Sequence, residues 1–251
     1  MDRILCQEAC LMHRFYTDQW QNQLAVLAPE DEKHAFRVLR LSPGDQVELI
    51  SLGKRYLAVL REGALLEPLS PLPSTEANLR ITLFQGLPKG DKMDWIIQKA
   101  VEIGVARVVP VMMDRCVIRL QPQDLPKKQA RWARIAREAG KQSGRAELPE
   151  VTLPIPLSQV PGLASGLDLC IVPWEDAHSS GPLSIMRTHP DIRSAGILIG
   201  PEGGIDPSEI DLLRNLFHPI TLGPRILRTE TAGLVTAAAI LALAGEMEGM
   251  S

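Results

Sequence analysis

Apolar and polar positions indicate a small strand-rich unit in the first part of the chain, over residues 12–70. From Gln46 to Ile50 they alternate, which predicts a half-buried strand. Gly53 separates this run from Arg55–Leu60 and predicts a hairpin turn. Before them, residues 31–41 predict a short helix that the Ser-Pro-Gly turn ends.

The pattern changes after a proline-rich stretch at residues 68–74, which we predict to be a linker. Short apolar runs then alternate with amphipathic stretches. They predict strands at 81–85, 108–112, 169–173, 196–199 and 219–222, and helices at 92–103, 127–142, 207–217 and 230–246. Such alternation predicts a mostly parallel α/β sheet, in which ligands bind at the carboxyl ends of the strands.

Composition and charge narrow the class of protein. The 251 residues are 45% hydrophobic and 23% charged, with a net charge of −3, as expected for a globular protein without a uniformly basic surface. The apolar run at 232–245 is shorter than the roughly 20 residues that span a bilayer. The cysteines and histidines do not have the spacing of metal ligands, so we expect no metal. We expect Cys6, Cys10, Cys116 and Cys170 to be reduced, as in a cytoplasmic protein.

A glycine-rich turn follows the predicted strand that ends at Ile199. It reads Gly200-Pro201-Glu202-Gly203-Gly204, and Asp206 with Pro207 is placed to cap the next helix. Glycines let a ligand approach the main chain closely. The spacing matches neither the dinucleotide nor the triphosphate motif. A ligand site and a plain tight turn both remain open.

A second turn, at residues 222–232, joins a short strand to an alanine-rich helix. Arg225, Arg228 and Glu230 crowd this turn, and two arginines beside glycine-exposed backbone suit an oxyanionic substrate. A structural cluster of ion pairs is the alternative.

Basic residues gather along residues 127–145, where Glu138 is the only acid. We predict that one helical face carries Lys127, Arg131, Arg134, Lys141 and Arg145. The apolar face is predicted to hold Trp132, Ile135, Ala136 and Ala139. The basic face favours a phosphate-binding stripe, with a solvated surface helix as the alternative. Trp95, among apolar neighbours on the predicted helix at 92–103, is expected in the core.

Together and in order, these motifs resemble the RsmE family of the SPOUT superfamily, the 16S ribosomal RNA uridine-N3 methyltransferases. The matching stretches are 200–204 with Glu209, 222–223, 226–228, 230–232, 99–105, 138–145, and His34 with 38–40 and 44–45. The first 11 residues have no recognised counterpart, and 51–53 replace the family's aspartate–glycine turn. The resemblance therefore runs from about Met12 to the end of the final helix.

The resemblance implies an α/β fold in two domains. Residues 1–72 would form a PUA-like RNA-binding β-barrel, with 1–11 a possible extension. Residues 73–251 would form a SPOUT methyltransferase domain with a C-terminal trefoil knot. The family also implies a homodimer, a partner in 16S rRNA of the small ribosomal subunit (its decoding region), and no membrane.

The resemblance further implies S-adenosylmethionine as the cofactor and assigns residues to it. Cofactor contacts are expected from Pro173, Ile199, Gly200, Pro201, Glu202, Gly203, Gly204, Leu222, Gly223, Ile226, Leu227, Arg228, Thr231 and Ala232. RNA contacts are expected from Arg14, Arg40, Lys89, Lys92, Arg134, Lys141, Gln142, Arg145 and Arg225.

Methylation of uridine N3 requires removal of its proton, so a base or a cation that stabilises charge on the uracil oxygens is needed. Arg228 is expected to stabilise the developing anion. Glu230 is a base or a support for Arg228, and we favour the support because a carboxylate is a weak base unless its pKa is raised. Glu202 is expected to brace the turn.

Two rival functions remain at the level of sequence. A SPOUT enzyme that methylates the ribose 2′-hydroxyl would share the cofactor and the knot. A non-catalytic RNA-binding module would bind no S-adenosylmethionine.

Overall fold

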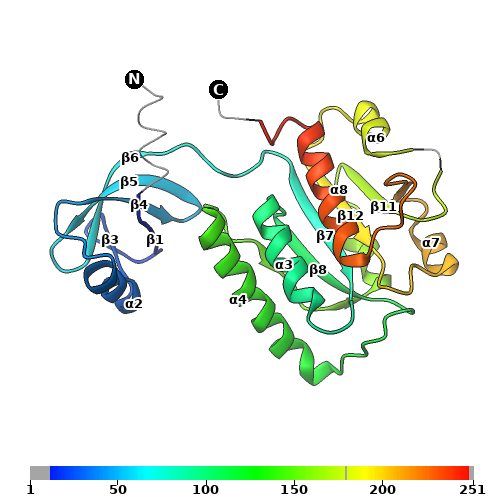
Figure 1. Cartoon of the computed structure of the whole chain (residues 1–251), viewed down its shortest axis with the longest axis horizontal. Coiled ribbons are helices and arrows are strands. Elements are labelled where there is room, and N and C mark those ends of the chain that lie inside the picture. The colour runs from blue at the N-terminus through cyan, green and yellow to red at the C-terminus, as the bar shows by residue number, and fades with distance from the viewer. Residues whose placement is uncertain (1–11, 179, 249–251) are drawn as a thin grey trace. The chain divides into compact units, whose positions relative to one another are not determined.

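The computed structural model describes residues 12–178 and 180–248 and divides the chain into two compact units. The described residues up to Glu76, together with Gly144–Leu148, make the first unit (Figure 1). The second contains Ala77–Ser143 and the residues that follow Leu148. Each unit has its own hydrophobic core. The suspected extension, Cys6 and Cys10 lie outside the described residues.

The first unit is a six-stranded sheet in the order β1-β4-β5-β6-β3-β2. The predicted hairpin is confirmed as β4 and β5, and the predicted short helix as α2 continued by a π-helical turn at His34–Val38. The strands are β1 Arg14–Tyr16, β2 Trp20–Gln21, β3 Leu24–Val26, β4 Gln46–Ser51, β5 Lys54–Arg61 and β6 Leu65–Pro71, and the helix is α2 Pro29–Lys33.

The predicted proline-rich linker is wrong in its first half, because β6 continues to Pro71. Two features let a strand hold these prolines. β3 pairs with Leu65 and Leu66, and among residues 12–178 and 180–248 no strand pairs with the rest of β6 on that side. The register against β5 also shifts between Leu57 and Ala58, opposite Pro68. Prolines are tolerated at edges and bulges because they cannot donate a ladder hydrogen bond.

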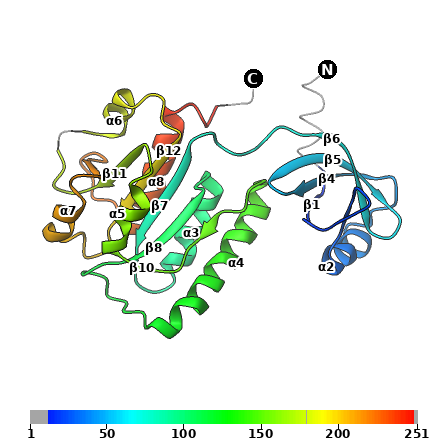
Figure 2. The ribbon, with the colours of Figure 1, turned by 180° about the vertical axis from the view of Figure 1, so that it is seen from behind.

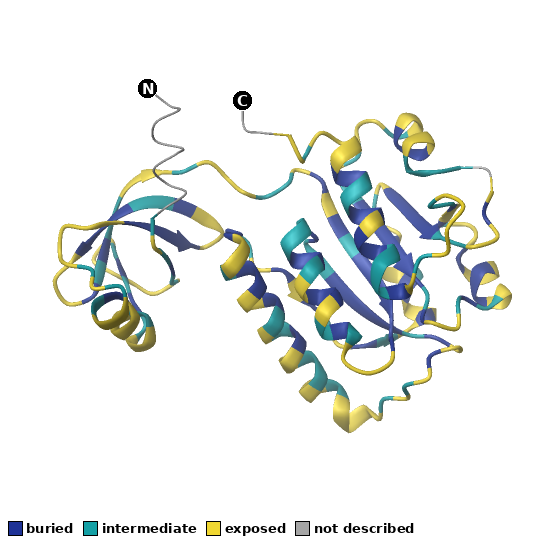
Figure 3. Cartoon of the chain, in the orientation of Figure 1, coloured by how far each residue is buried: buried dark blue, intermediate teal, exposed yellow. Residues whose placement is uncertain are grey.

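The second unit is a parallel sheet of seven strands, as the alternation of elements predicts. The order is β10-β8-β7-β12-β11-β13, with β9 paired to β8. The strands are β7 Arg80–Gly86, β8 Arg107–Met112, β9 Glu150–Val151, β10 Ile155–Pro156, β11 Leu169–Pro173, β12 Ser194–Ile199 and β13 His218–Ile220. The central strands are almost wholly buried, as strands covered on both faces must be (Figure 3).

Helices pack on this sheet. In Figure 1, α3 and α8 lie in front of β7 and β12, and Figure 2 shows them behind the same strands, so both cover one face. The helices are α3 Lys92–Ile103, α4 Leu125–Ser143, α5 Val160–Ala164, α6 Pro182–Thr188, α7 Pro207–Leu213 and α8 Thr229–Leu243; short 3-10 turns occupy Pro122–Asp124 and Leu157–Gln159. Helix α7 ends earlier than the predicted 217.

Within the described residues, no helix has the length and apolar character needed to cross a membrane. Cys116 and Cys170 are buried and free, as predicted for small apolar residues.

Candidate functional site

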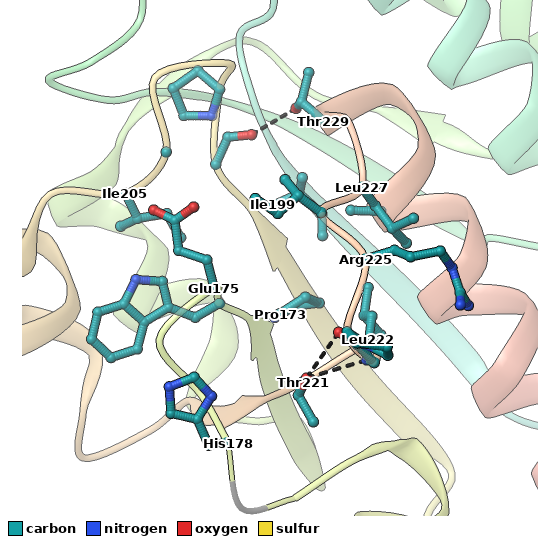
Figure 4. Close-up of a pocket in the computed structure, with 18 residues that line it drawn as sticks. Pro173, Glu175, His178, Ile199, Ile205, Thr221, Leu222, Arg225, Leu227 and Thr229 are labelled. Atoms are coloured by element: carbon teal, nitrogen blue, oxygen red, sulfur yellow. Dashed lines mark hydrogen bonds between the residues drawn. The ribbon is translucent and has the colours of Figure 1, made fainter.

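A cavity of about 500 Å³ opens at the carboxyl ends of β11, β12 and β13, where a parallel sheet is expected to bind its ligand (Figure 4). Three loops, one after each strand, form its walls. The lining residues are Pro173, Trp174, Glu175, His178, Ile199, Gly200, Pro201, Gly204, Ile205, Thr221, Leu222, Gly223, Pro224, Arg225, Ile226, Leu227, Thr229 and Ala232. Most of the predicted cofactor residues therefore meet at one cavity.

Glycines shape two of these loops. Gly204 and Gly223 have φ values of +75° and +95°, in the region that disfavours other residues. A Cβ on Gly200 would lie 2.7 Å from Ile205 Cγ1, so the turn has no room for a side chain. The main chain therefore lines the cavity directly and offers its polar groups to a ligand.

The first glycine turn is anchored at its far end. Asp206 caps α7 with its side chain and Pro207 follows, as predicted, and Glu209 completes a capping box. Glu209 also accepts a hydrogen bond of 2.9 Å from the Asp114 backbone N–H. Arg115 donates to Asp206 and to the Gly203 carbonyl at 3.0 and 3.2 Å. These contacts tie the turn to the loop after β8.

Glu202, which was predicted to contact the cofactor, does not line the cavity and instead bridges two segments. Its carboxylate accepts a hydrogen bond from the Lys89 backbone N–H at 3.1 Å and pairs with Lys92 Nζ at 3.0 Å. Burial raises the pKa of Glu202, but hydrogen bonds from Lys92 and from nearby backbone N–H groups lower it by more. The pKa of Glu202 therefore lies below its ordinary value. Glu202 therefore braces the turn, the role favoured from sequence.

Lys92 also connects Glu202 to Glu230, since its Nζ lies 3.1 Å from the Glu230 carboxylate. The hydrogen bonds to Glu202 and then Glu230 raise the pKa of Lys92. Burial raises the pKa of Glu230, but its own backbone N–H and Lys92 bring it below its ordinary value. Glu230 is thus held as an anion and is poorly suited to accept a proton.

Arg228 reaches into solvent at the mouth of the site. Its side chain is 84% exposed. Arg228 Nη1 lies 4.0 Å from the Glu230 carboxylate, whereas Lys92 Nζ lies 3.1 Å from it. Arg225, predicted to bind RNA, lines the cavity instead. The predicted cofactor residues Glu202, Gly203, Arg228 and Thr231 are not among the residues that line the cavity.

The loop after β11 contributes residues that sequence reasoning missed. Glu175 and His178 face the cavity from the side opposite Leu222 and Arg225 (Figure 4), and Trp174 also lines it. They carry no motif, and their one available signal was their position just after a predicted strand. Ile205, Thr221, Pro224 and Thr229 were also missed, although each adjoins a predicted residue.

The prediction that Trp95 lies in the core is wrong, because its side chain is 45% exposed. With Lys92 and Glu230, Trp95 lines a second cavity of about 280 Å³. An exposed indole beside the predicted catalytic residues is suited to stack on a planar base.

Two cations expected to contact RNA are engaged in ion pairs of the first unit. Arg145 follows the end of α4 rather than sharing its basic face, and it pairs with Glu76 at 2.6 Å, with the two side chains 7% and 10% exposed. Arg14 Nε lies 2.8 Å from the fully buried Glu48. Both guanidinium groups are therefore held in ion pairs within the first unit, and RNA contacts by Arg14 and Arg145 stay a prediction. Arg40 is exposed.

Helix α4 has the amphipathic form expected from sequence. Trp132, Ala136 and Ala139 are buried, while Arg134 and Gln142 are exposed and Lys141 is half-buried. Arg131 is neutralised in part by Asp94. The exposed face is therefore less basic than the sequence implies, with Lys127 and Arg134 among its exposed cations.

Comparison with known proteins places this architecture in a family. Residues 75–241 match the model of the RNA methyltransferase domain, and residues 27–63 match that of the RNA methyltransferase PUA domain. The curated ribosomal RNA small subunit methyltransferase E of Bacillus subtilis is 32% identical over 91% of this chain and 96% of its own.

Two solved structures are similar throughout. Ribosomal RNA small subunit methyltransferase E from Neisseria gonorrhoeae, bound to S-adenosyl methionine, has a TM-score of 0.73 and 32% identity, covering 92% of this chain and 98% of its own. A Legionella pneumophila putative methyltransferase with bound cofactor SAM has a TM-score of 0.75 and 31% identity, covering 92% and 97%. The family model and these full-length likenesses show that the chain belongs to the ribosomal RNA small subunit methyltransferase E family.

Proposed function

We propose that this protein transfers a methyl group from S-adenosylmethionine to uridine N3 in 16S rRNA of the small ribosomal subunit. The observation that carries the proposal is the cavity where three strand-end loops meet, in a chain whose relatives include a methyltransferase bound to S-adenosyl methionine. The relatives' names support a small-subunit rRNA methyltransferase and give no support to ribose 2′-O methylation.

The cavity fits this cofactor. Its volume of about 500 Å³ lies within the usual range of ligand pockets, and Leu222, Ile226 and Leu227 supply apolar walls. The exposed main chain of the two glycine turns can hydrogen-bond the adenine edge, and the Glu175 carboxylate offers an acceptor to ribose hydroxyls or an ammonium group. When bound, S-adenosylmethionine supplies an activated methyl group.

The protein's own residues would prepare the uracil. We assign Arg228 to stabilise negative charge on the uracil oxygens, because its guanidinium is exposed at the mouth of the site. Glu230, held as an anion by Lys92, would restrain Arg228 rather than remove the N3 proton. The cavity lined by Lys92, Trp95 and Glu230 would receive the base, with Trp95 as the stacking surface.

The rest of the chain would bind and orient the RNA. The PUA-like unit and the exposed cations of α4 offer surfaces for RNA. We further propose that the loops around the cavity form a trefoil knot and that two chains form a homodimer. Val235 and Leu243, 42% exposed on the apolar helix α8, favour the dimer.

Arg228→Ala tests the catalytic assignment. We expect methyl transfer to small-subunit rRNA to fall about 100-fold or more, as when a charge-stabilising donor is removed, while calorimetry shows unchanged S-adenosylmethionine affinity. Equal losses of both would instead make Arg228 a cofactor or folding residue. Wild-type protein that binds RNA but no S-adenosylmethionine would favour the non-catalytic module.

A further inference from the structure

A buried hydrogen-bonded path runs behind the cofactor cavity. Gln85, at the end of β7, is fully buried, and its Nε2 donates to Thr229 Oγ1 at 3.0 Å. Thr229, the first residue of α8, in turn donates from Oγ1 to the Gly200 carbonyl at 2.6 Å (Figure 4). Side chains from one strand and one helix therefore hold the first glycine turn.

The direction of each hydrogen bond is fixed by its partners. The Gln85 amide also donates to the Gly86 carbonyl at 3.1 Å, and because a carbonyl can only accept, Nε2 must lie on this side. A threonine hydroxyl has a single hydrogen. With Gln85 donating to its oxygen, that hydrogen is directed at Gly200.

Close packing holds the same turn from below. A Cβ on Gly86 would lie 2.8 Å from Pro201 N and 2.9 Å from the Ile199 carbonyl. A Cβ on Gly233, in α8, would lie 3.2 Å from Ile199 Cγ1. A side chain has no space at Gly86, and at Gly233 it fits only if its neighbours shift, so the turn is packed closely against both β7 and α8.

The Gln85 amide is an unusual group to bury at this point. Among the described residues its Oε1 has no hydrogen-bond partner, which is costly for a buried acceptor. An apolar side chain of similar size would fill the space without that cost. This observation indicates that the amide is retained for its donor, the group that contacts Thr229.

We propose that Gln85 and Thr229 are positioning residues that couple the cofactor turn to the catalytic start of α8. Thr229 lies between Arg228 and Glu230 in the chain, so the bond that fixes the Gly200 carbonyl also fixes the residues assigned to the uracil. Removing the hydroxyl weakens S-adenosylmethionine binding and misplaces Arg228 together. This inference rests on the proposed function of the cavity.

Thr229→Val keeps the shape of the side chain but removes the hydroxyl. In calorimetry with S-adenosylmethionine we expect its affinity to fall about tenfold, the loss typical of one buried hydrogen bond. Turnover measured at saturating S-adenosylmethionine stays reduced, because Arg228 remains misplaced. Thr229→Ser, which keeps the hydroxyl, restores affinity to within about threefold of wild type, since the hydrogen bond can reform.

Thr236→Val is the matched control. Thr236 is a fully buried threonine of the same helix, but its hydroxyl donates at 2.7 Å to the Ala232 carbonyl within α8. Its loss should lower thermal stability without changing S-adenosylmethionine affinity. Gln85→Met, which removes the donor and the unpartnered acceptor, should weaken binding as Thr229→Val does, and the two losses should not add.

The outcomes separate this inference from the proposed function. Unchanged S-adenosylmethionine affinity in folded Thr229→Val or Gln85→Met would overturn the positioning role of Gln85 and Thr229, while the cofactor site itself would stand. Equal weakening by Thr236→Val would also overturn that role, because the effect would then come from general instability. Wild-type protein that fails to bind S-adenosylmethionine would overturn the proposed function itself, and with it the positioning role of Gln85 and Thr229.

Discussion

At the scale of single residues, burial decides what each cation can do. Arg145 and Glu76 form a nearly buried pair, and Glu76 also accepts hydrogen bonds from the Ala146 and Glu147 backbone N–H groups at 2.9 and 3.2 Å. Arg134 is exposed on α4. The two arginines carry the same charge, but one holds a loop of the first unit and the other is open to a partner.

Arg145→Ala is expected to destabilise the first unit by about 3 kcal/mol, because it leaves the Glu76 carboxylate buried without its partner. Arg134→Ala should change stability by less than about 0.5 kcal/mol, as exposed substitutions do. Urea unfolding of both variants measures the difference in the free energy of unfolding. Equal urea midpoints for Arg145→Ala and Arg134→Ala would show that Arg145 is not a structural residue.

Residue spacing alone could not separate these arginines. The sequence places Arg145 in register with the basic face of α4 only if the helix continues. It ends at Ser143, and Gly144, with a φ of +75°, redirects the chain. The spacing therefore predicted the exposed face of α4 correctly, but its prediction for Arg145 failed because Arg145 follows Gly144, beyond the end of the helix.

At the scale of elements, segments with a clear apolar pattern were predictable, whereas several of the shortest elements were not. Helix α3 and strand β11 have the predicted bounds, since their apolar positions repeat clearly. The two-residue strands β9 and β10 and the short helix α6 carry too few residues to show a period. Their positions are set by tertiary packing.

The link from α3 to the two turns, through Glu202, Lys92 and Glu230, gives a pH prediction. Both carboxylates have lowered pKa values in the folded protein, so their stabilisation is present above the unfolded value of 4.5 and is lost as the pH falls through the folded values. Lys92→Met should therefore lower the midpoint temperature of thermal unfolding at pH 7, and this decrease should become progressively smaller below pH 4.5.

Lys99→Met is the control for this prediction. Lys99 lies on the same helix and pairs with Glu102 three residues along, at 2.8 Å, in a local surface ion pair worth little. We expect it to change the midpoint less than Lys92→Met at pH 7. A Lys92→Met deficit that is the same at pH 3.5 and pH 7 would remove the ionic link from the account.

The exposed face of α4 predicts a salt-dependent RNA interaction. Replacing Lys127 and Arg134 with alanine should reduce the slope of log affinity against log salt by about one for each RNA phosphate that is no longer neutralised. Titrations of small-subunit rRNA at several salt concentrations measure this slope. Arg131→Ala should change it less, because Asp94 already pairs with Arg131. A slope that the double variant leaves unchanged would exclude the face from RNA binding.

At the scale of the whole molecule, the apolar helix α8 predicts association. Val235, on α8, is 42% exposed, and Val235→Lys should convert a dimer to monomers in analytical ultracentrifugation, because charge does not tolerate burial in an apolar interface. Leu212, on α7, is 52% exposed, and Leu212→Lys is the matched control that should leave the dimer intact. A wild-type monomer would contradict the proposed dimer.

The assembled site shows how far sequence reaches at this scale. The glycine turns were recognisable because glycine marks backbone that a ligand can approach, and the sheet then brings both turns to one edge. The hydrogen bond of Gln85 with Thr229 joins residues 144 positions apart and has no motif, so only the folded chain reveals it. Trp174 and His178 likewise become part of the site through the position of β11 alone.

The most direct test of the account is nucleoside analysis of its RNA product. Small-subunit rRNA from cells that lack the protein is incubated with the protein and S-adenosylmethionine, digested, and examined by mass spectrometry. We expect 3-methyluridine, absent from the untreated RNA and formed in much smaller amount by Arg228→Ala. A 2′-O-methylated nucleoside without 3-methyluridine, or no new methylated nucleoside, would contradict it.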